Sequence, residues 1–371
     1  MLDQILKEKE YLPVLQMQDG SPVTRENWPQ RRQEMLQLLM QYSYGRTPKA
    51  PDYLECRVES VCPDEFAGKV RQELVKIGFR CARGFFTFPV TFYIPKKVQR
   101  PPVFLHIAFR PAPDRYIPVE EITDAGFALV VLCYKDVVND NLGGDYSDGI
   151  AKFFGTTATD RAPDEWGKIG MWAYAASRVM DYIVQERADL DAEHVAVIGH
   201  SRLGKTALWA AAQDERFFAA ISNNSGYGGA ASSKDGHGER IRDFLHWGSW
   251  DWFCENFKTF TDEKEDQKPY DQSFLLALIA PRYLLVGSAA EDYGADPQSE
   301  FLTTLHASAA WTLLEQTGLV TPDDLPKENA VLHEGFIGYH LRPGKHFLSR
   351  QDWNYYMQFI TDKIAQEKHG K

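Results

Sequence analysis

The stretch His194-Val-Ala-Val-Ile-Gly-His-Ser-Arg-Leu-Gly-Lys-Thr-Ala-Leu-Trp209 decides the fold of this chain. Residues 195–198 form a short β-branched, apolar run, which predicts a buried strand. The Ala-rich run over residues 203–212 favours a helix. Ser201 stands between the two, as the serine of a nucleophile elbow does. Such a turn exposes the hydroxyl to a base, and backbone N–H groups at the helix N-terminus can meet the oxyanion. The glycine that usually follows the serine by two residues is displaced here by one, to Gly204.

Length and charge narrow the class of protein. A chain of 371 residues can bury a large core, enough for one large α/β domain and an extension. The net charge is −11, and no basic run occurs, which argues against nucleic acid as a partner. The 9 Trp, 17 Tyr and 22 Phe suit a protein with an aromatic-lined cleft of carbohydrate size.

No targeting or membrane segment is evident in the sequence. Residues 1–20 contain no apolar core of signal-peptide length, and no later run reaches the roughly 18 apolar residues of a membrane span. The number of cysteines is odd, and their spacing fits no metal site. We therefore expect a cytoplasmic protein with reduced thiols, no bound metal and no membrane contact.

The order of predicted elements indicates the architecture. A helix is predicted within residues 24–46, followed by three antiparallel strands at 54–61, 70–79 and 85–94. Buried strands then alternate with helical segments, the clearest of which is 163–187; the strands are 103–109, 127–134, 195–198, 217–222 and 283–287. This alternation predicts an α/β fold, a three-layer α/β/α sandwich with a mostly parallel sheet. We expect one α/β-hydrolase domain over residues 1–371, with residues 1–100 integrated into it as a helical and antiparallel extension.

The catalytic base should follow the serine in the chain. In an α/β-hydrolase the order is serine, acid, histidine, so the base belongs in a loop after the last strand. His346 lies in such a loop, marked by Pro343 and Gly344, before a helix predicted to start near Gln351. His340 is the alternative, although its apolar surroundings favour a packed histidine.

The acid should follow the strand at residues 283–287. Asp292 is the first choice in the loop 288–297, and Glu291 and Asp296 are alternatives. A buried carboxylate there would orient the imidazole and stabilise its protonated form. Any of the three could instead cap the helix after Pro297.

Two cations accompany the serine. The backbone N–H of Arg202 and one from the loop after Phe109 are the predicted oxyanion donors. The side chains of Arg202 and Lys205 would suit an anionic substrate. Alternatively, both are ordinary surface residues or pair with the acidic loop.

The segment Gly199-His-Ser-Arg-Leu-Gly-Lys205 resembles the Gly-Cys-Ser-Arg-x-Gly-Lys nucleophile motif of the glucuronoyl esterases, carbohydrate esterase family 15. The likeness extends over nearly the whole chain and includes residues 44–48, 223–230, 252–253, 276–282 and 344–346. The resemblance implies a cofactor-free serine hydrolase that cleaves the ester between 4-O-methyl-glucuronate on xylan and a lignin alcohol. It also implies that Arg202 helps to hold the oxyanion and that Lys205 contacts the uronate.

The sequence departs from the family pattern at two places. Asn224 stands where fungal members carry the catalytic Glu, and an amide cannot serve as the triad anion, so the acid must come from the later loop, which strengthens Asp292 or Glu291. The family often carries a sugar-stacking Trp near the acid, where this chain has Tyr293; we expect Tyr293 and Trp252 to contact substrate.

The expected substrate is a small-molecule or oligosaccharide ester, and the oligomeric state stays open. Two other functions remain: an acetyl or general carboxylic ester hydrolase on the same triad, and a non-catalytic sugar-binding relative.

Overall fold

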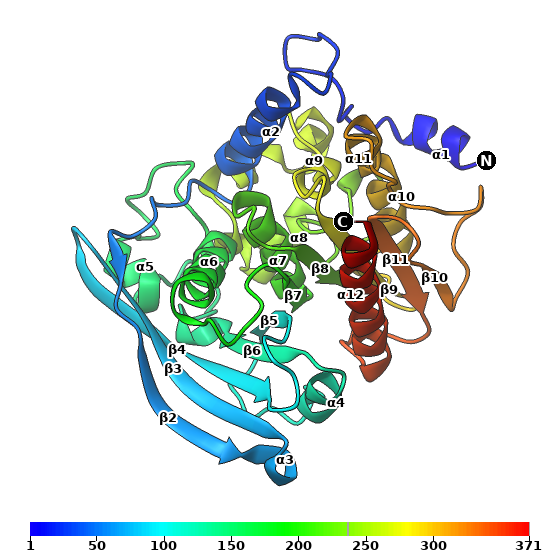
Figure 1. Cartoon of the computed structure of the whole chain (residues 1–371). Helices are drawn as coiled ribbons and strands as arrows, with labels where there is room; N and C mark the ends of the chain where they lie inside the picture. Colours follow the sequence, from blue (N-terminus) through cyan, green and yellow to red (C-terminus); the bar gives the residue numbers. More distant parts are fainter. Residues whose placement is uncertain (236, 371) are drawn as a thin grey trace.

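The computed structural model describes residues 1–235 and 237–370. Its central element is a sheet of eleven strands (Figure 1). The strand order is β1-β3-β4-β6-β5-β7-β8-β9-β11-β10, and β2 also pairs with β3. The middle of the sheet is parallel and consists of β6 (Ala128–Cys133), β5 (Val103–Ala108), β7 (Val195–His200), β8 (Ala219–Asn223), β9 (Tyr283–Ala289) and β11 (Ile337–Arg342).

The N-terminal part of the sheet is antiparallel. It consists of β1 (Tyr53–Leu54), β2 (Arg57–Asp64), β3 (Val70–Cys81) and β4 (Gly84–Pro95). In Figure 1 the long strands β2, β3 and β4 curve along one side of the molecule. β4 pairs antiparallel with β6, so this extension continues the parallel sheet without a break. At the opposite edge, β10 (Ala330–Leu332) pairs antiparallel with β11.

Helices cover both faces of the sheet. On one face lie α6 (Lys168–Glu186) and α7 (Arg202–Gln213), and on the other lie α4 (Val119–Asp124) and α12 (Arg350–Gly370) (Figure 1). The side chains of β7 alternate between these layers: Val195 and Val197 join the core on the α6 and α7 side, and Ile198 joins the core on the α12 side. Both faces of β7 are therefore buried, which is why it is apolar throughout, and the predicted three-layer α/β/α architecture is confirmed.

The remaining helices are shorter or peripheral. They are α1 (Leu2–Lys9), α2 (Trp28–Tyr42), α3 (Glu65–Gly68), α5 (Gly149–Phe154), α8 (Ile241–Trp247), α9 (Gln272–Ala277), α10 (Pro297–Ala307) and α11 (Ala309–Leu313). Short 3-10 turns are η1 (Tyr134–Asp136), η2 (Ser233–Asp235), η3 (Trp250–Trp252), η4 (Glu255–Phe260) and η5 (Asp262–Gln267). None of the helices in the described ranges is both long and apolar enough to cross a membrane.

One predicted strand is divided in the structure. Residues 54–61 belong to β1 and β2, both of which pair with β3. The link between them stays close to the sheet, because the N–H of Glu55 donates to the carbonyl of Gly78 at 2.8 Å.

Candidate active site

Ser201 occupies a sharp turn between β7 and α7. Its backbone has φ 58° and ψ −130°, in the left-handed range that a serine seldom adopts. The turn is closed by the N–H of Ser201, which donates to the carbonyl of Asn223 at 2.9 Å, and by the N–H of Gly204, which donates to the carbonyl of Ser201 at 2.8 Å. A Cβ at Gly199 would lie 1.9 Å from the carbonyl oxygen of Leu203, so only glycine fits there. The strand–turn–helix context expected of a nucleophile elbow is present.

His346 and Asp292 meet across two loops. His346 follows β11, Asp292 follows β9, and Nδ1 of the imidazole lies 2.6 Å from Oδ2 of the carboxylate. Burial alone would raise the pKa of Asp292, but the hydrogen bonds from His346 and Asn224 more than offset it and lower the pKa below 3.8. An ionised Asp292 requires Nδ1 to carry the hydrogen, which leaves Nε2 free to accept a proton.

The other sequence candidates lie elsewhere. Glu291 is exposed, and its backbone N–H donates to Gly344 at 2.9 Å. Asp296 caps α10, because its carboxylate accepts from the N–H of Ser299 at 3.0 Å. His340 is buried in β11, with Nε2 2.9 Å from Asp352. Of the candidate acids, Asp292 is the one that the structure brings to His346.

Asn224 contacts the acid directly, which the sequence did not indicate. Its side-chain amide donates to Oδ2 of Asp292 at 2.7 Å. The next two residues are held by Glu300: the N–H groups of Ser225 and Gly226 donate to its Oε1 at 2.7 and 3.0 Å. Glu300 is completely buried, and burial raises its pKa to about 7. The loop after β8 thus supports the acid that comes from the loop after β9.

Arg202 is held by an aspartate that sequence reasoning missed. Its guanidinium forms an ion pair with Asp140, and the indole N–H of Trp252 donates to the same carboxylate at 2.8 Å. The guanidinium carbon lies 4.2 Å from the centroid of the Trp252 ring. The indole is largely buried and orients Arg202. An aspartate in a long loop carries no pattern of its own, so the sequence offered no signal for Asp140.

Lys205 is buried and paired. Its Nζ donates to the carbonyl of Ser225 at 2.5 Å and to Oε2 of Glu239 at 2.9 Å. Tyr293, by contrast, is 75% exposed and follows Asp292 on the same loop. Lys205 is therefore not an ordinary surface residue, and its charge is balanced by the carboxylate of Glu239.

His200 lies against His346, with ring centroids 4.5 Å apart. Its Nδ1 lies 2.7 Å from Oδ1 of Asn223. The pKa of His200 is lowered to about 4, mainly by burial and to a smaller extent by the neighbouring His346. His200 is thus neutral at physiological pH.

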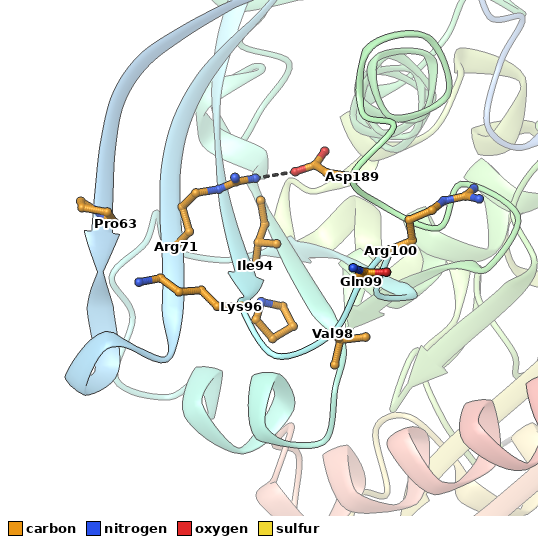
Figure 2. A pocket seen from close by; sticks show the side chains of 9 residues that line it. Pro63, Arg71, Ile94, Lys96, Val98, Gln99, Arg100 and Asp189 are labelled. Atoms are coloured by element: carbon orange, nitrogen blue, oxygen red, sulfur yellow. Dashed lines mark hydrogen bonds and ion pairs between the residues drawn. The ribbon is translucent and has the colours of Figure 1, made fainter.

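Two pockets are candidates for a binding site. One of about 350 Å³ is lined by Ser201, Arg202, His200 and His346 together with apolar side chains. A larger one of about 520 Å³ lies between the antiparallel extension and the turn after β4 (Figure 2). Its Arg71 forms an ion pair with Asp189, drawn as a dashed line, and its lining offers no serine, cysteine or histidine. Of these two pockets, the smaller one is lined by both Ser201 and a histidine that can act as a base.

No group of three or more His, Cys, Asp or Glu side chains in the described ranges is arranged to hold a metal ion. The residues that gather around Ser201 are those of acyl transfer: a hydroxyl, an imidazole with its carboxylate, and a cation at the first turn of a helix.

Three comparisons with known proteins point to one family. A family model described as glucuronyl esterase of fungi matches residues 83–315, more than half of the chain. The carbohydrate esterase MZ0003 from an unknown prokaryotic organism is 35% identical, over 95% of this chain and 89% of its own length. A glucuronoyl esterase from Solibacter usitatus has a TM-score of 0.86 at 33% identity, over 95% of this chain and 97% of that one.

A second solved structure extends the likeness. The carbohydrate esterase family 15 glucuronoyl esterase from Teredinibacter turnerae has a TM-score of 0.86 at 27% identity, over 97% of this chain and 90% of that one. The chain is a carboxylic ester hydrolase that belongs to the glucuronoyl esterase family, carbohydrate esterase family 15.

Proposed function

We propose that this esterase hydrolyses esters of glucuronate or 4-O-methyl-glucuronate through an acyl-enzyme on Ser201. The observation that carries the proposal is the contact of Asp292 with Nδ1 of His346, which leaves Nε2 free to act as a base in the pocket that Ser201 also lines. The names of the relatives, which are glucuronoyl esterases, support the uronate as the acyl part.

Acylation begins with a proton transfer. Nε2 of His346 takes the hydroxyl proton of Ser201 as Oγ attacks the ester carbonyl carbon. The negative charge that develops on the carbonyl oxygen is stabilised by the backbone N–H of Arg202, the first residue of α7, and by the guanidinium of the same residue. Asp292 stabilises the imidazolium.

The tetrahedral intermediate then collapses. The bond to the alcohol oxygen breaks, His346 returns its proton to that oxygen, and the alcohol leaves. Water enters, His346 takes one of its protons, and the hydroxide oxygen attacks the acyl carbon. Ser201 is released with that proton on Oγ, and the uronate departs as the free acid.

The side chains near Arg202 along the chain and on the acid loop are assigned to the sugar part of the substrate. We assign Lys205, paired with Glu239, to the uronate and its hydroxyls, and the exposed ring of Tyr293 to stacking on a sugar face. Trp252 acts through Arg202, because its N–H is engaged by Asp140. The substrate is thus a small-molecule or oligosaccharide ester.

The proposal is tested with benzyl glucuronate and p-nitrophenyl acetate, assayed side by side on the wild type and Ser201→Ala. We expect the uronate ester to be turned over efficiently by the wild type and not by the variant. Faster turnover of the acetate would favour an acetyl or general esterase on the same triad. Turnover of neither ester above the background of the variant would favour a sugar-binding relative without catalysis.

A cytoplasmic location stays a prediction. It is supported by the cysteines, Cys56, Cys62, Cys81, Cys133 and Cys254, all of which are free thiols.

A further inference from the structure

The proposed base, His346, lies in a segment that is open to solvent. Of residues 343–347, which directly follow β11, four are exposed, and the side chain of His346 is 43% exposed. Asp292 orients the imidazole ring, but the main chain that carries the ring needs a support of its own. The requirement is strict, because a displacement of about 1 Å can lower the rate of a catalysed reaction by about 10²-fold.

The guanidinium of Arg342 provides that support from inside the segment. Arg342 is the last residue of β11 and is 4% exposed. Its Nη1 donates to the carbonyl of Pro343 at 2.8 Å, and its Nη2 donates to the carbonyls of Lys345, at 3.1 Å, and Phe347. Lys345 and Phe347 are the residues immediately before and after His346. One side chain thus binds the main chain on both sides of the base.

The same segment is joined to the loop of the acid. The N–H of Glu291 donates to the carbonyl of Gly344, and the N–H of Ala290 donates to the carbonyl of Arg342, both at 2.9 Å. Gly344 has φ 89°, in the left-handed region that favours glycine, which lets the chain turn around the guanidinium. Because Glu291 directly precedes Asp292, these bonds fix the main chain of the base relative to that of the acid.

Asp352 holds the guanidinium in turn. It is completely buried in the first turn of α12, and its Oδ2 accepts from Nε of Arg342 at 2.7 Å and from the N–H and hydroxyl of Ser349 at 2.7 Å each. Its Oδ1 lies 2.9 Å from Nε2 of His340. Burial alone would raise the pKa of Asp352, but the hydrogen bond with His340 and the charge of Arg342 more than offset it and keep the pKa below its ordinary value.

The contacts depend on the shape of the guanidinium as well as on its charge. Nε, Nη1 and Nη2 each have a partner, and the partners lie on different sides of one planar group. A lysine would bring the same charge as a single ammonium, which cannot reach a carboxylate and three carbonyls in that fixed fork geometry. The arrangement therefore predicts that lysine cannot replace Arg342.

We propose that Arg342, held by Asp352, is a positioning residue that fixes the main chain on both sides of His346 and thereby keeps the base in place beside Ser201. The inference rests on the proposed function in taking His346 as the base, but it applies to any ester that acylates Ser201. It also gives the buried His340 a role, as a support of Asp352.

The experiment needs a control that loses the same kind of contact elsewhere. Arg282 also spends its guanidinium on backbone carbonyls, with Nη2 donating to Ala211 at 2.8 Å and Nη1 to Phe217 at 3.0 Å. Ala211 lies in the last turn of α7 and Phe217 lies just before β8, so both are at the opposite ends of these elements from Ser201 and Asn223. Arg282→Lys is therefore the matched control for Arg342→Lys.

The measurements are kcat and KM for benzyl glucuronate and for p-nitrophenyl acetate, together with the melting temperature of each protein. We expect Arg342→Lys to lower kcat by about 10- to 100-fold and to leave KM within about twofold of the wild type, by the same factors for both esters. Arg282→Lys should lose melting temperature but keep its kcat. Asp352→Asn is a second variant that keeps the side-chain volume and removes the ion pair, and its kcat should fall by about tenfold.

Chemical rescue separates the fork from the charge. In Arg342→Ala, millimolar guanidinium chloride should restore part of the lost kcat, because the free ion has the same planar donors as the missing side chain. Methylammonium chloride at the same concentration should not. Equal rescue by both ions would overturn the proposed role of the guanidinium geometry.

Three further results would overturn the inference. One is wild-type kcat in folded Arg342→Lys or, where that variant does not fold, in folded Asp352→Asn. The second is an equal fall of kcat in Arg282→Lys, and the third is a fall confined to the uronate ester, which would assign Arg342 to substrate binding. If the wild type cleaves the acetate but not the uronate ester, the proposed substrate fails, and the acetate data still decide this inference. Turnover of neither ester would contradict both.

Discussion

Asn224 donates its side-chain amide to Oδ2 of Asp292 at 2.7 Å, the same oxygen that lies 2.6 Å from Nδ1 of His346. The amide of Asn224 thus lies next to the acid, at the position where fungal members of the family carry the catalytic Glu. The amide favours the ionised form of Asp292, and an ionised Asp292 is what the proposed base requires.

Replacing Asn224 tests this contact. Asn224→Ala removes one hydrogen bond to a charged group, and we expect kcat/KM for a uronate ester to fall about tenfold. Asn224→Asp puts a like charge beside Asp292, which raises the pKa of Asp292 and moves the acidic limb of the pH profile to higher pH. The profile of kcat/KM against pH is the measurement, and an unchanged acidic limb in Asn224→Asp would count against the contact.

Asp292 and Glu291 are adjacent in the sequence, so amide substitutions of the two provide a test variant and its matched control. Asp292→Asn keeps the shape but removes the anion that orients His346, so we expect kcat to fall about 10³- to 10⁴-fold. Glu291→Gln alters an exposed side chain, and its kcat should stay within about twofold of the wild type. The acid would have to be reassigned if the two effects were reversed.

Asp140 should matter to the transition state more than to binding. Its ion pair orients Arg202, so in Asp140→Asn we expect kcat to fall about 10- to 100-fold with little change in KM. Trp252→Phe removes the N–H that Asp140 accepts and reduces the ring that faces the Arg202 guanidinium, but it keeps the ion pair, so it should have a smaller effect. Steady-state kinetics of both variants, with thermal melting as the check on folding, would reveal a purely structural role if only the melting temperature changed.

Stability should decline as the pH falls below about 6.5. Burial lowers the pKa of His106 and His200 to about 4 and that of His333 to about 3, from 6.5. The unfolded chain binds these protons first, so their stabilisation is complete above pH 6.5 and is lost as the pH falls toward 4. Glu300 works in the opposite direction, since its pKa is raised to about 7 and the folded form takes up its proton first.

Near pH 5.5 the effect of the three histidines exceeds that of the one glutamate, so the free energy of unfolding should fall by on the order of 2 kcal/mol for each pH unit of acidification. Urea unfolding between pH 7 and pH 5 measures it. His333→Leu, which is remote from Ser201, should reduce the slope by the share of one histidine. A free energy of unfolding that is flat over this range would refute the assignment of neutral buried histidines.

Much of the fold was predictable because its signals are local. The β-branched run before Ser201 and the Ala-rich run after it each predict one element, and the structure has β7 and α7 there. The predicted helix within residues 163–187 is α6. That residues 1–371 form one domain stays a prediction, consistent with the pairing of β4 and β6 in a single sheet.

The site was predictable only where it follows a pattern along the chain. The order of serine, acid and histidine led to His346 and to the loop of Asp292. Asp140 was not predictable, because its contact with Arg202 spans 62 residues and depends on how a long loop folds. Sequence reasoning also could not determine that the indole N–H of Trp252 is engaged by Asp140, which makes the ring a support for Arg202.

The central claim is an acyl-enzyme on Ser201, and the most direct measurement is the mass of the protein during turnover. Wild type and Ser201→Ala would be mixed with benzyl glucuronate, quenched with acid within the first turnover, and analysed intact and after proteolysis. The account predicts one added glucuronoyl group on the wild-type peptide that contains Ser201, and none on the variant. A glucuronoyl group on another residue, or undiminished ester hydrolysis by Ser201→Ala, would contradict it.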